Sequence, residues 1–394
     1  MRWGLNVNGF FASVQEYLTD TNGYSMELRR DGATVRSYSI GDAVDGQVES
    51  MPGSPVASVP WTTTTNMQIG SCSKLITAIA LTKIIQDTPG VSAGDAITPY
   101  LPAYWDLAAP NVDQITFADL MTMTSGLEFT SNNFSQQTYV AAREAIATGA
   151  LNANDIGHTY NYLNVNFDLC RVLMATVSGA IDTAYVYDGP PLPASSGPSG
   201  TPPPPWHHLT QLEADDDIWD QRTIAFYEQY VQENILGPAG VTATLSRPAQ
   251  CALAYTAPPV SIPGWNSGDM SEYAGPAGWH MSVSDLLTLI GAFRRAGTIM
   301  SPASAQAMLD AHYGIDWQHG PQTSPAGNLY PKNGDDGNNL GQIEQSGLVF
   351  FPLDMECVVF VNSPSANDLL NVISGAFVDN LVEEQVQSGG GFGI

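Results

Sequence analysis

Strand signals stand at the two ends of this 394-residue chain, and helix signals fill its middle. Near the start, residues 24–30 and 33–40 alternate in polarity around Asp31-Gly32, a dipeptide typical of a two-residue hairpin turn. Near the end, the apolar runs 347–351 and 357–361 predict a second pair of strands. The pattern therefore predicts an α/β (α+β sandwich) architecture, in which one antiparallel sheet is built from both chain ends and flanked by helices.

Helices are predicted where apolar residues recur with a period near 3.6 behind a capping residue. The predicted helices are 10–19, 71–86, 115–123, 166–177, 218–235, 282–296 and 368–386. Between 311 and 341 the composition predicts loops. We therefore expect a discontinuous sheet domain, residues 1–88 with 272–394, and a mainly helical domain, residues 89–271, inserted into it.

A Pro/Gly/Ser-rich insertion interrupts the helical domain at 186–217. Its proline content excludes a regular helix or a central strand, so we expect a solvated surface excursion. The alternative is a lid or a partner-binding arm near the active site. The insertion contains Trp206-His207-His208, for which a surface aromatic cluster is favoured over a metal or catalytic role. The glycine-rich tail 388–393 is expected to be disordered.

The net charge is −26, with 39 acidic residues against 13 basic ones. Such a chain has no basic patch to neutralise phosphates, which argues against nucleic acid and anionic membranes as partners. No run of 18 apolar residues predicts a transmembrane helix. Residues 1–6 lack the apolar segment of a signal peptide, so the compartment stays open between the cytoplasm and export with a signal already removed.

The four cysteines show no metal-ligand spacing, and we expect neither a disulfide framework nor a zinc site. They are Cys72, Cys170, Cys251 and Cys357. Cys72 and Cys170 are expected to be small buried hydrophobic residues. No cofactor and no metal is expected.

Only three of the 13 basic residues are lysines, namely Lys74, Lys83 and Lys332. A chain that uses arginine almost everywhere has kept lysine where a deprotonatable amine would be needed, and arginine cannot take that role. Lys74 stands three residues after Ser71, so the two side chains share one face of the predicted helix. A hydroxyl held beside an amine can become a nucleophile. The alternative is that Ser71 only caps the helix.

Two further polar groups could serve a serine nucleophile. Tyr162 and Asn164 form a Tyr-x-Asn pair before an apolar helix, and a tyrosine beside ammonium groups can act as base and then as acid. The alternative is a packed tyrosine with helix-capping asparagines. Lys332-Asn333-Gly334 offers a cation followed by a small residue, although the surrounding composition is also that of a turn.

The order Ser-x-x-Lys, Tyr-x-Asn, Lys-x-Gly resembles the serine β-lactamase-like superfamily, and most closely its branch of class C β-lactamases, DD-peptidases and family VIII carboxylesterases. Four further segments are similar to motifs of that branch: 120–127 to "LLTHTSGL", 164–167 to "NTNY", 234–241 to "HILEPLGM", and 275–286 to "PAGGLYSTASDL". The resemblance covers about residues 10–386. It implies a β-lactamase/transpeptidase-like fold.

The resemblance also implies a role for each motif residue. Ser71 would be the acylated nucleophile, Lys74 its activating amine, Tyr162 the general base and acid, and Asn164 a supporting residue. Lys332 and Gly334 would form the third motif on an edge strand, with the backbone N–H groups of Ser71 and Asp335 as oxyanion hole. The family more often has a small residue at the position of Asp335, so a carboxylate there would disfavour anionic substrates.

These features predict a serine hydrolase that forms an acyl-enzyme on Ser71, with a carboxylesterase acting on small esters as the favoured activity. The alternatives are a β-lactamase, a D-aminopeptidase, DD-peptidase or amidase, and an acyl transferase. A non-catalytic scaffold of the same fold is disfavoured because all three motifs keep their reactive side chains. The expected partner is a small-molecule ester or amide, and the oligomeric state stays open.

Overall fold

The computed structural model describes residues 2–51, 54–128, 138–192, 208–316 and 322–384. Two compact units make up the chain: unit 1 comprises Met1–Leu75, Leu236–Met270 and Ala277–Ile394, and unit 2 comprises Ile76–Ile235 and Ser271–Pro276. Residues 236–270 thus lie in unit 1, whereas the sequence prediction placed them in the inserted domain. Residues 236–270 belong to unit 1 because they form backbone bridges to it, such as Cys251 with Asn66 and Tyr255 with Ile343.

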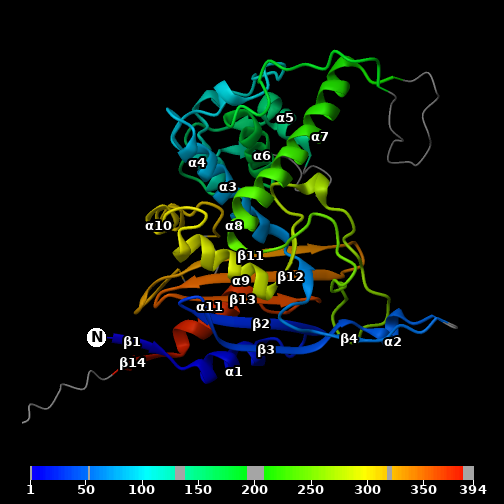
Figure 1. Ribbon diagram of the computed structural model, residues 1–394, viewed down its shortest axis with the longest axis vertical. Coiled ribbons are helices and arrows are strands. Elements are labelled where there is room, and N and C mark those ends of the chain that lie inside the picture. Colours follow the sequence, from blue (N-terminus) through cyan, green and yellow to red (C-terminus); the bar gives the residue numbers. More distant parts are fainter. Residues whose placement is uncertain (1, 52–53, 129–137, 193–207, 317–321, 385–394) are drawn as a thin grey trace, which may run out of the picture. The chain divides into compact units, whose positions relative to one another are not determined.

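Unit 1 contains a six-stranded antiparallel sheet in the order β11-β12-β13-β2-β3-β4 (Figure 1). The strands are β2 (Gly23–Arg30), β3 (Ala33–Val44), β4 (Val59–Pro60), β11 (Tyr330–Gly337), β12 (Ile343–Phe351) and β13 (Met355–Val361). The first and last parts of the chain meet where β13 pairs with β2. This arrangement confirms the predicted antiparallel sheet built from both chain ends.

Helices α1 (Val7–Tyr17) and α11 (Leu369–Asp379) pack together on one face of this sheet. Phe351 of β12 joins them, since its ring stacks on Phe377 with centroids 4.0 Å apart and meets Phe10 edge-on. Cys357, Val359 and Val361 belong to the same buried cluster. Alternate residues of a strand face one side, so β13 supplies this core with every second residue.

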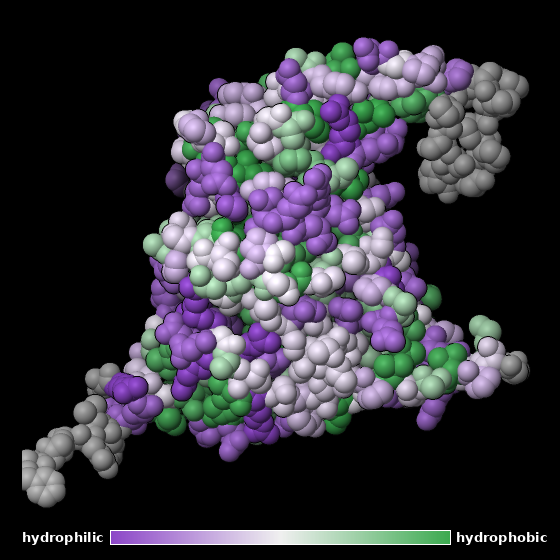
Figure 2. Space-filling model, viewed as in Figure 1, coloured by the Kyte–Doolittle hydropathy of each residue, from purple (hydrophilic) through white to green (hydrophobic). Residues whose placement is uncertain are grey.

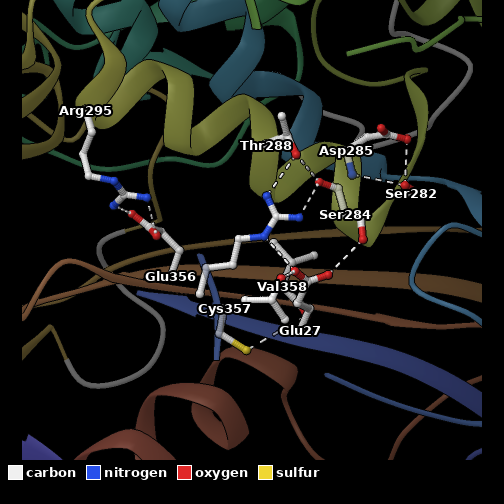
Figure 3. A network of polar contacts seen from close by, with 11 residues as sticks. Glu27, Ser282, Ser284, Asp285, Thr288, Arg295, Glu356, Cys357 and Val358 are labelled. Atoms are coloured by element: carbon white, nitrogen blue, oxygen red, sulfur yellow. Dashed lines mark hydrogen bonds and ion pairs between the residues drawn. The ribbon is translucent and has the colours of Figure 1, made fainter. Parts of the chain in front are cut away.

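A polar network fastens the opposite face of the sheet to α9 (Val283–Gly291). Figure 3 shows Ser284 and Thr288 of this helix close to Glu27 of β2. Glu27 accepts hydrogen bonds from Thr34, Arg29 and Ser284, and Arg29 also donates to Thr288. Burial alone would raise the pKa of the Glu27 carboxyl, but the three hydrogen bonds outweigh it and lower that pKa. The carboxylate is therefore held in its charged form.

A second part of the network follows α9. The segment Ala292–Ala296 continues the helix as a π-helical turn, and its Arg294 and Arg295 both pair with the buried carboxylate of Glu356 on β13. Helix α10 (Pro302–Asp310) comes next. The helix predicted over 282–296 is thus present, with its predicted cap: Ser282 accepts a hydrogen bond from the Asp285 N–H.

The predicted closing helix over 368–386 is wrong beyond residue 379. Helix α11 ends there, and β14 (Leu381–Glu384) pairs with β1 (Arg2–Leu5), a strand that the sequence analysis did not predict. Asn380 ends the helix because its side chain donates to the Ala376 carbonyl and to Ser13, while its own carbonyl accepts the Asn6 N–H.

The loop prediction for 311–341 is also wrong in part, because residues 330–337 form β11 at the sheet edge. Regular pairing with β12 overrides the turn-like composition of this segment. Three small two-stranded sheets complete the strands of the described residues: β5 (Asn66–Gln68) with β8 (His280–Ser282), β6 (Leu127–Glu128) with β7 (Ala150–Leu151), and β9 (Thr323–Ser324) with β10 (Gly327–Asn328).

Unit 2 is mainly helical. Its helices are most of α3 (Ser73–Asp87), then α4 (Phe117–Met121), α5 (Tyr139–Thr148), α6 (Val165–Val177) and α7 (Gln211–Val231). Every residue of α6 is buried. Helix α7 begins seven residues before its predicted start because Thr210 and Glu213 form a capping box.

Two sequence predictions lie outside the described residues: the 388–393 tail, and the 193–207 part of the insertion with Trp206 and His207. Among the described residues, no helix has the length and apolar character needed to cross a membrane. All four cysteines are buried free thiols.

Candidate functional site

Ser71 and Lys74 are in direct contact at the junction of a 3₁₀ turn (Gly70–Cys72) and α3. The Lys74 Nζ donates a hydrogen bond to the Ser71 Oγ over 2.7 Å. Lys74 is 0% exposed, which is rare for a lysine. The two atoms between which a proton would pass are therefore already within hydrogen-bond reach.

Two hydrogen bonds fix the main chain just before Ser71. The Ile69 N–H donates to the Trp279 carbonyl, and the Gly70 N–H donates to the Gln68 side chain. Gln68 ends β5, which is paired with β8. Because these contacts hold the main chain before Ser71, its hydroxyl is presented from a rigid element rather than from a loose loop.

Edge strand β11 approaches this turn so closely that two glycines are required. A Cβ atom on Gly334 would lie 2.1 Å from the Ile69 carbonyl oxygen and 2.6 Å from the Ser71 nitrogen. Gly70 has φ +51°, and a Cβ there would lie 2.8 Å from the Asp335 nitrogen. The Ser71 turn and β11 therefore meet here. These two segments carry the two backbone N–H groups that are predicted to form an oxyanion hole, those of Ser71 and Asp335.

Lys332 is held in a buried ion pair that the sequence analysis did not foresee. Its Nζ lies 2.9 and 2.8 Å from the two carboxylate oxygens of Asp316, and Asp316 also accepts the Asn333 N–H. Both side chains are almost wholly buried. The cation of the third motif is therefore already compensated by a protein carboxylate. The side chain of Asp335, in contrast, is exposed and accepts a hydrogen bond from Gln345.

Tyr162 and Asn164 lie in unit 2, at the start of α6. Tyr162 is 36% exposed. Asn164 occupies the N-cap position of α6, yet its side chain makes no capping hydrogen bond. Its Oδ1 atom is buried and has no hydrogen-bond partner among the described residues. Helix capping, the alternative considered for this asparagine, is thus not what its side chain does.

The sequence-predicted residues therefore divide between the two units. Ser71, Lys74, Lys332, Gly334 and Asp335 come together in unit 1, while Tyr162 and Asn164 belong to unit 2.

Two acidic side chains face each other beside this site. Asp336 of β11 pairs in register with Glu344 of β12. Burial raises the pKa of Asp336 to about 6, and burial followed by the charge of Asp336 raises the pKa of Glu344 well above its ordinary value of 4.5. One oxygen of each carboxyl group, Asp336 Oδ2 and Glu344 Oε2, has no hydrogen-bond partner within the described part of the chain.

Replacing Glu344 by glutamine is expected to stabilise the protein by about 1–3 kcal/mol at pH 8 and to change little at pH 5. A carboxyl whose pKa is raised on folding costs stability as the pH rises from its unfolded value through its folded value, and glutamine removes that cost. Urea unfolding at the two pH values measures the difference. The exposed Glu16→Gln is the control, and an equal or smaller stability of Glu344→Gln at pH 8 would refute the argument.

Comparison with known proteins supports the resemblance seen in the motifs. The β-lactamase family model matches residues 18–185. No curated protein matches the sequence.

Several solved structures share the fold. A penicillin-binding protein homologue from Pyrococcus abyssi, described as octameric, aligns with a TM-score of 0.62 and 17% identity over 94% of this chain and 76% of its own. A penicillin binding protein from Bacillus halodurans gives 0.57 and 18%, over 93% and 98%. EstCE1, described as a hydrolase with promiscuous acyltransferase activity, gives 0.63 and 16%, over 94% and 98%. The chain thus has a β-lactamase-like fold, and its resemblance to the serine β-lactamase-like superfamily is confirmed.

Proposed function

We propose that this protein is a serine hydrolase that forms an acyl-enzyme on Ser71, and specifically a carboxylesterase acting on small esters. The observation that carries the proposal is the 2.7 Å hydrogen bond between the buried Lys74 amine and the Ser71 hydroxyl. The close approach of Gly334 to the Ser71 nitrogen adds the second requirement, a place for an oxyanion beside the nucleophile.

The proposed reaction has two halves. Lys74 takes the proton of Ser71 while the Ser71 oxygen attacks the ester carbonyl carbon, and the N–H groups of Ser71 and Asp335 bind the resulting oxyanion. Tyr162, supported by Asn164, gives a proton to the leaving alcohol as the carbon–oxygen bond breaks. A water molecule then attacks the acyl-enzyme and gives a proton to the Tyr162 phenolate, while Lys74 returns its proton to the Ser71 oxygen as the acid leaves. This restores Ser71, Lys74 and Tyr162.

The charges around the third motif favour a neutral ester over a β-lactam or a peptide carboxylate. Asp316 compensates Lys332, and the exposed Asp335 adds a negative charge next to the proposed oxyanion hole. A substrate carboxylate would meet repulsion rather than a free cation there. Acyl transfer remains the second candidate, because the same acyl-enzyme can pass to an alcohol and one neighbour of the same fold is described with that activity.

Wild-type protein is expected to hydrolyse p-nitrophenyl butyrate much faster than nitrocefin, and Ser71→Ala is expected to lose about 10³-fold or more of the ester activity. Ser92→Ala, which changes a serine in a surface turn of unit 2, is the matched control. A fluorophosphonate probe should label wild type and the control, but not Ser71→Ala. The hydrolase proposal fails if wild type cleaves neither substrate and stays unlabelled, and rapid nitrocefin cleavage would replace the esterase by a β-lactamase.

A further inference from the structure

Unit 1 contains a cavity of about 790 Å³ that is separate from the Ser71 site. It lies beside β4, at the edge of the sheet opposite to β11, and the segment around residues 247–266 closes its other side. Its volume is within the range of small-molecule sites. None of the residues assigned to the hydrolase site lines it.

One wall of the cavity is apolar. Val44, Val56, Val59 and Leu253 contribute to it. Figure 2 shows hydrophobic residues gathered over this end of unit 1, near α2 (Gly46–Glu49) and β4. Val56 and Val59 are 41% and 46% exposed, so the apolar wall is open to a ligand from solvent.

The guanidinium of Arg247 also lines the cavity. Arg247 uses one nitrogen to donate to the carbonyls of Cys251 and Ala252, while its Nε has no partner among the described residues. No carboxylate within the described part of the chain forms an ion pair with it. Glu344 is close enough for Arg247 to lower the pKa of its carboxyl, although burial raises that pKa further and leaves it well above its ordinary value. Among the described residues the guanidinium therefore has no carboxylate in ion-pair contact, in a chain rich in acids.

A carboxylate lines the same cavity without a cationic partner. Glu49 ends α2, and its Oε1 accepts the Gly264 N–H. No ion pair joins Glu49 to Arg247 or to any other base among the residues that the structure describes. The lining of the cavity thus offers a positive group and a negative group that form no ion pair with each other.

These two groups are anchored to backbone segments that contact each other. Arg247 is tied to residues 251 and 252, whereas Glu49 is tied to Gly264, which packs against Leu253. The amine and carboxylate of an α-amino acid, with a hydrogen bond of about 2.9 Å at each end, bridge groups roughly 6–8 Å apart.

We propose that this cavity binds a free α-amino acid with an apolar side chain. Arg247 holds its carboxylate, Glu49 holds its ammonium group, and the wall around Val44 and Leu253 takes the side chain. A carboxylate–guanidinium pair accounts for the uncompensated Arg247, and the ammonium group accounts for Glu49. A plain carboxylate or a plain amine would satisfy one charge and leave the other unpaired.

Calorimetric titration of the full chain with leucine, leucinamide and isocaproate tests the assignment. Leucinamide lacks the carboxylate and isocaproate lacks the amine, so each is expected to bind wild type ~10-fold or more weakly than leucine. In Arg247→Met, leucine should lose its advantage over leucinamide. In Glu49→Gln, which keeps an oxygen for the Gly264 N–H, leucine should lose its advantage over isocaproate.

These two changes in preference are readouts that a general loss of folding cannot produce, and melting curves identify any variant that is unfolded. Arg36→Met, which removes an arginine of β3 that does not line the cavity, should bind leucine like wild type. Absence of leucine binding to wild type at millimolar concentration overturns the proposal. The proposal is also overturned if isocaproate and leucine bind wild type equally. It is overturned as well if neither Arg247→Met nor Glu49→Gln changes leucine binding.

Discussion

Lys74→Arg is expected to lower ester hydrolysis by about 10³-fold or more while the protein stays folded. A guanidinium remains protonated at any pH that the protein tolerates, so it cannot take the proton of Ser71. It would keep the positive charge and the ability to donate to the Ser71 oxygen. Lys74→Arg therefore removes the proton transfer and keeps the positive charge. Lys74→Met removes both.

Ester hydrolysis, circular dichroism and melting temperature should be measured together on these variants. Lys83→Arg is the matched control, because Lys83 lies in the same helix and pairs with Asp87 near the surface. Arginine is larger than lysine and position 74 is buried, so circular dichroism and melting temperature show whether crowding disturbs the fold of Lys74→Arg. Lys74→Met shows the loss of activity when the amine and its charge are removed without added bulk. Substantial activity in a folded Lys74→Arg protein would remove the proposed role of Lys74.

The scarcity of lysine in the sequence pointed to Lys74, which is 0% exposed in the structure. Lys74 and Lys332 are both buried and hydrogen-bonded to polar groups, whereas Lys83 forms an ordinary ion pair one turn along a helix. Composition alone could not distinguish the two buried lysines from the surface lysine, because it does not say which side chain is buried. The spacing of Ser71 and Lys74 was informative because it lies within one helical turn.

Other features could not be predicted because they depend on contacts between distant segments. Asp316 carries no local pattern that would connect it to Lys332, and the segment between them has the composition of a loop. Strands β1 and β14 are short and pair across the whole length of the chain. Hydrophobic periodicity indicates the secondary structure that one segment favours by itself. Pairing between two distant segments therefore leaves no pattern in the sequence of either one.

The β11 segment shows how a local preference and a family resemblance can disagree. Residues 330–337 contain glycine, asparagine and aspartate, which favour turns. The resemblance instead implied an edge strand at Lys332 and Gly334, and the structure has a strand there. Gly334 explains the discrepancy, since a residue without a side chain is needed where β11 meets the Ser71 turn.

Asp316→Asn is expected to destabilise the protein by about 3–5 kcal/mol, because it leaves the ammonium group of Lys332 buried without a counter-charge. Lys332 is 1% exposed, and both of its hydrogen bonds to Asp316 are shorter than 3.0 Å. Asparagine has nearly the same shape as aspartate and can still accept the Asn333 N–H. The expected loss is therefore that of the charge rather than of packing.

The double variant Asp316→Asn/Lys332→Met should recover most of this loss, because it removes both charges and fills the space with an apolar chain of similar length. Urea unfolding with a fixed slope measures all four members of the cycle. Asp87→Asn, at the surface pair with Lys83, should change stability by less than about 1 kcal/mol. If Asp316→Asn matches that control, or the double variant is no more stable than the single one, Asp316 does not compensate a buried charge, and the argument that Lys332 is unavailable to an anionic substrate falls with it.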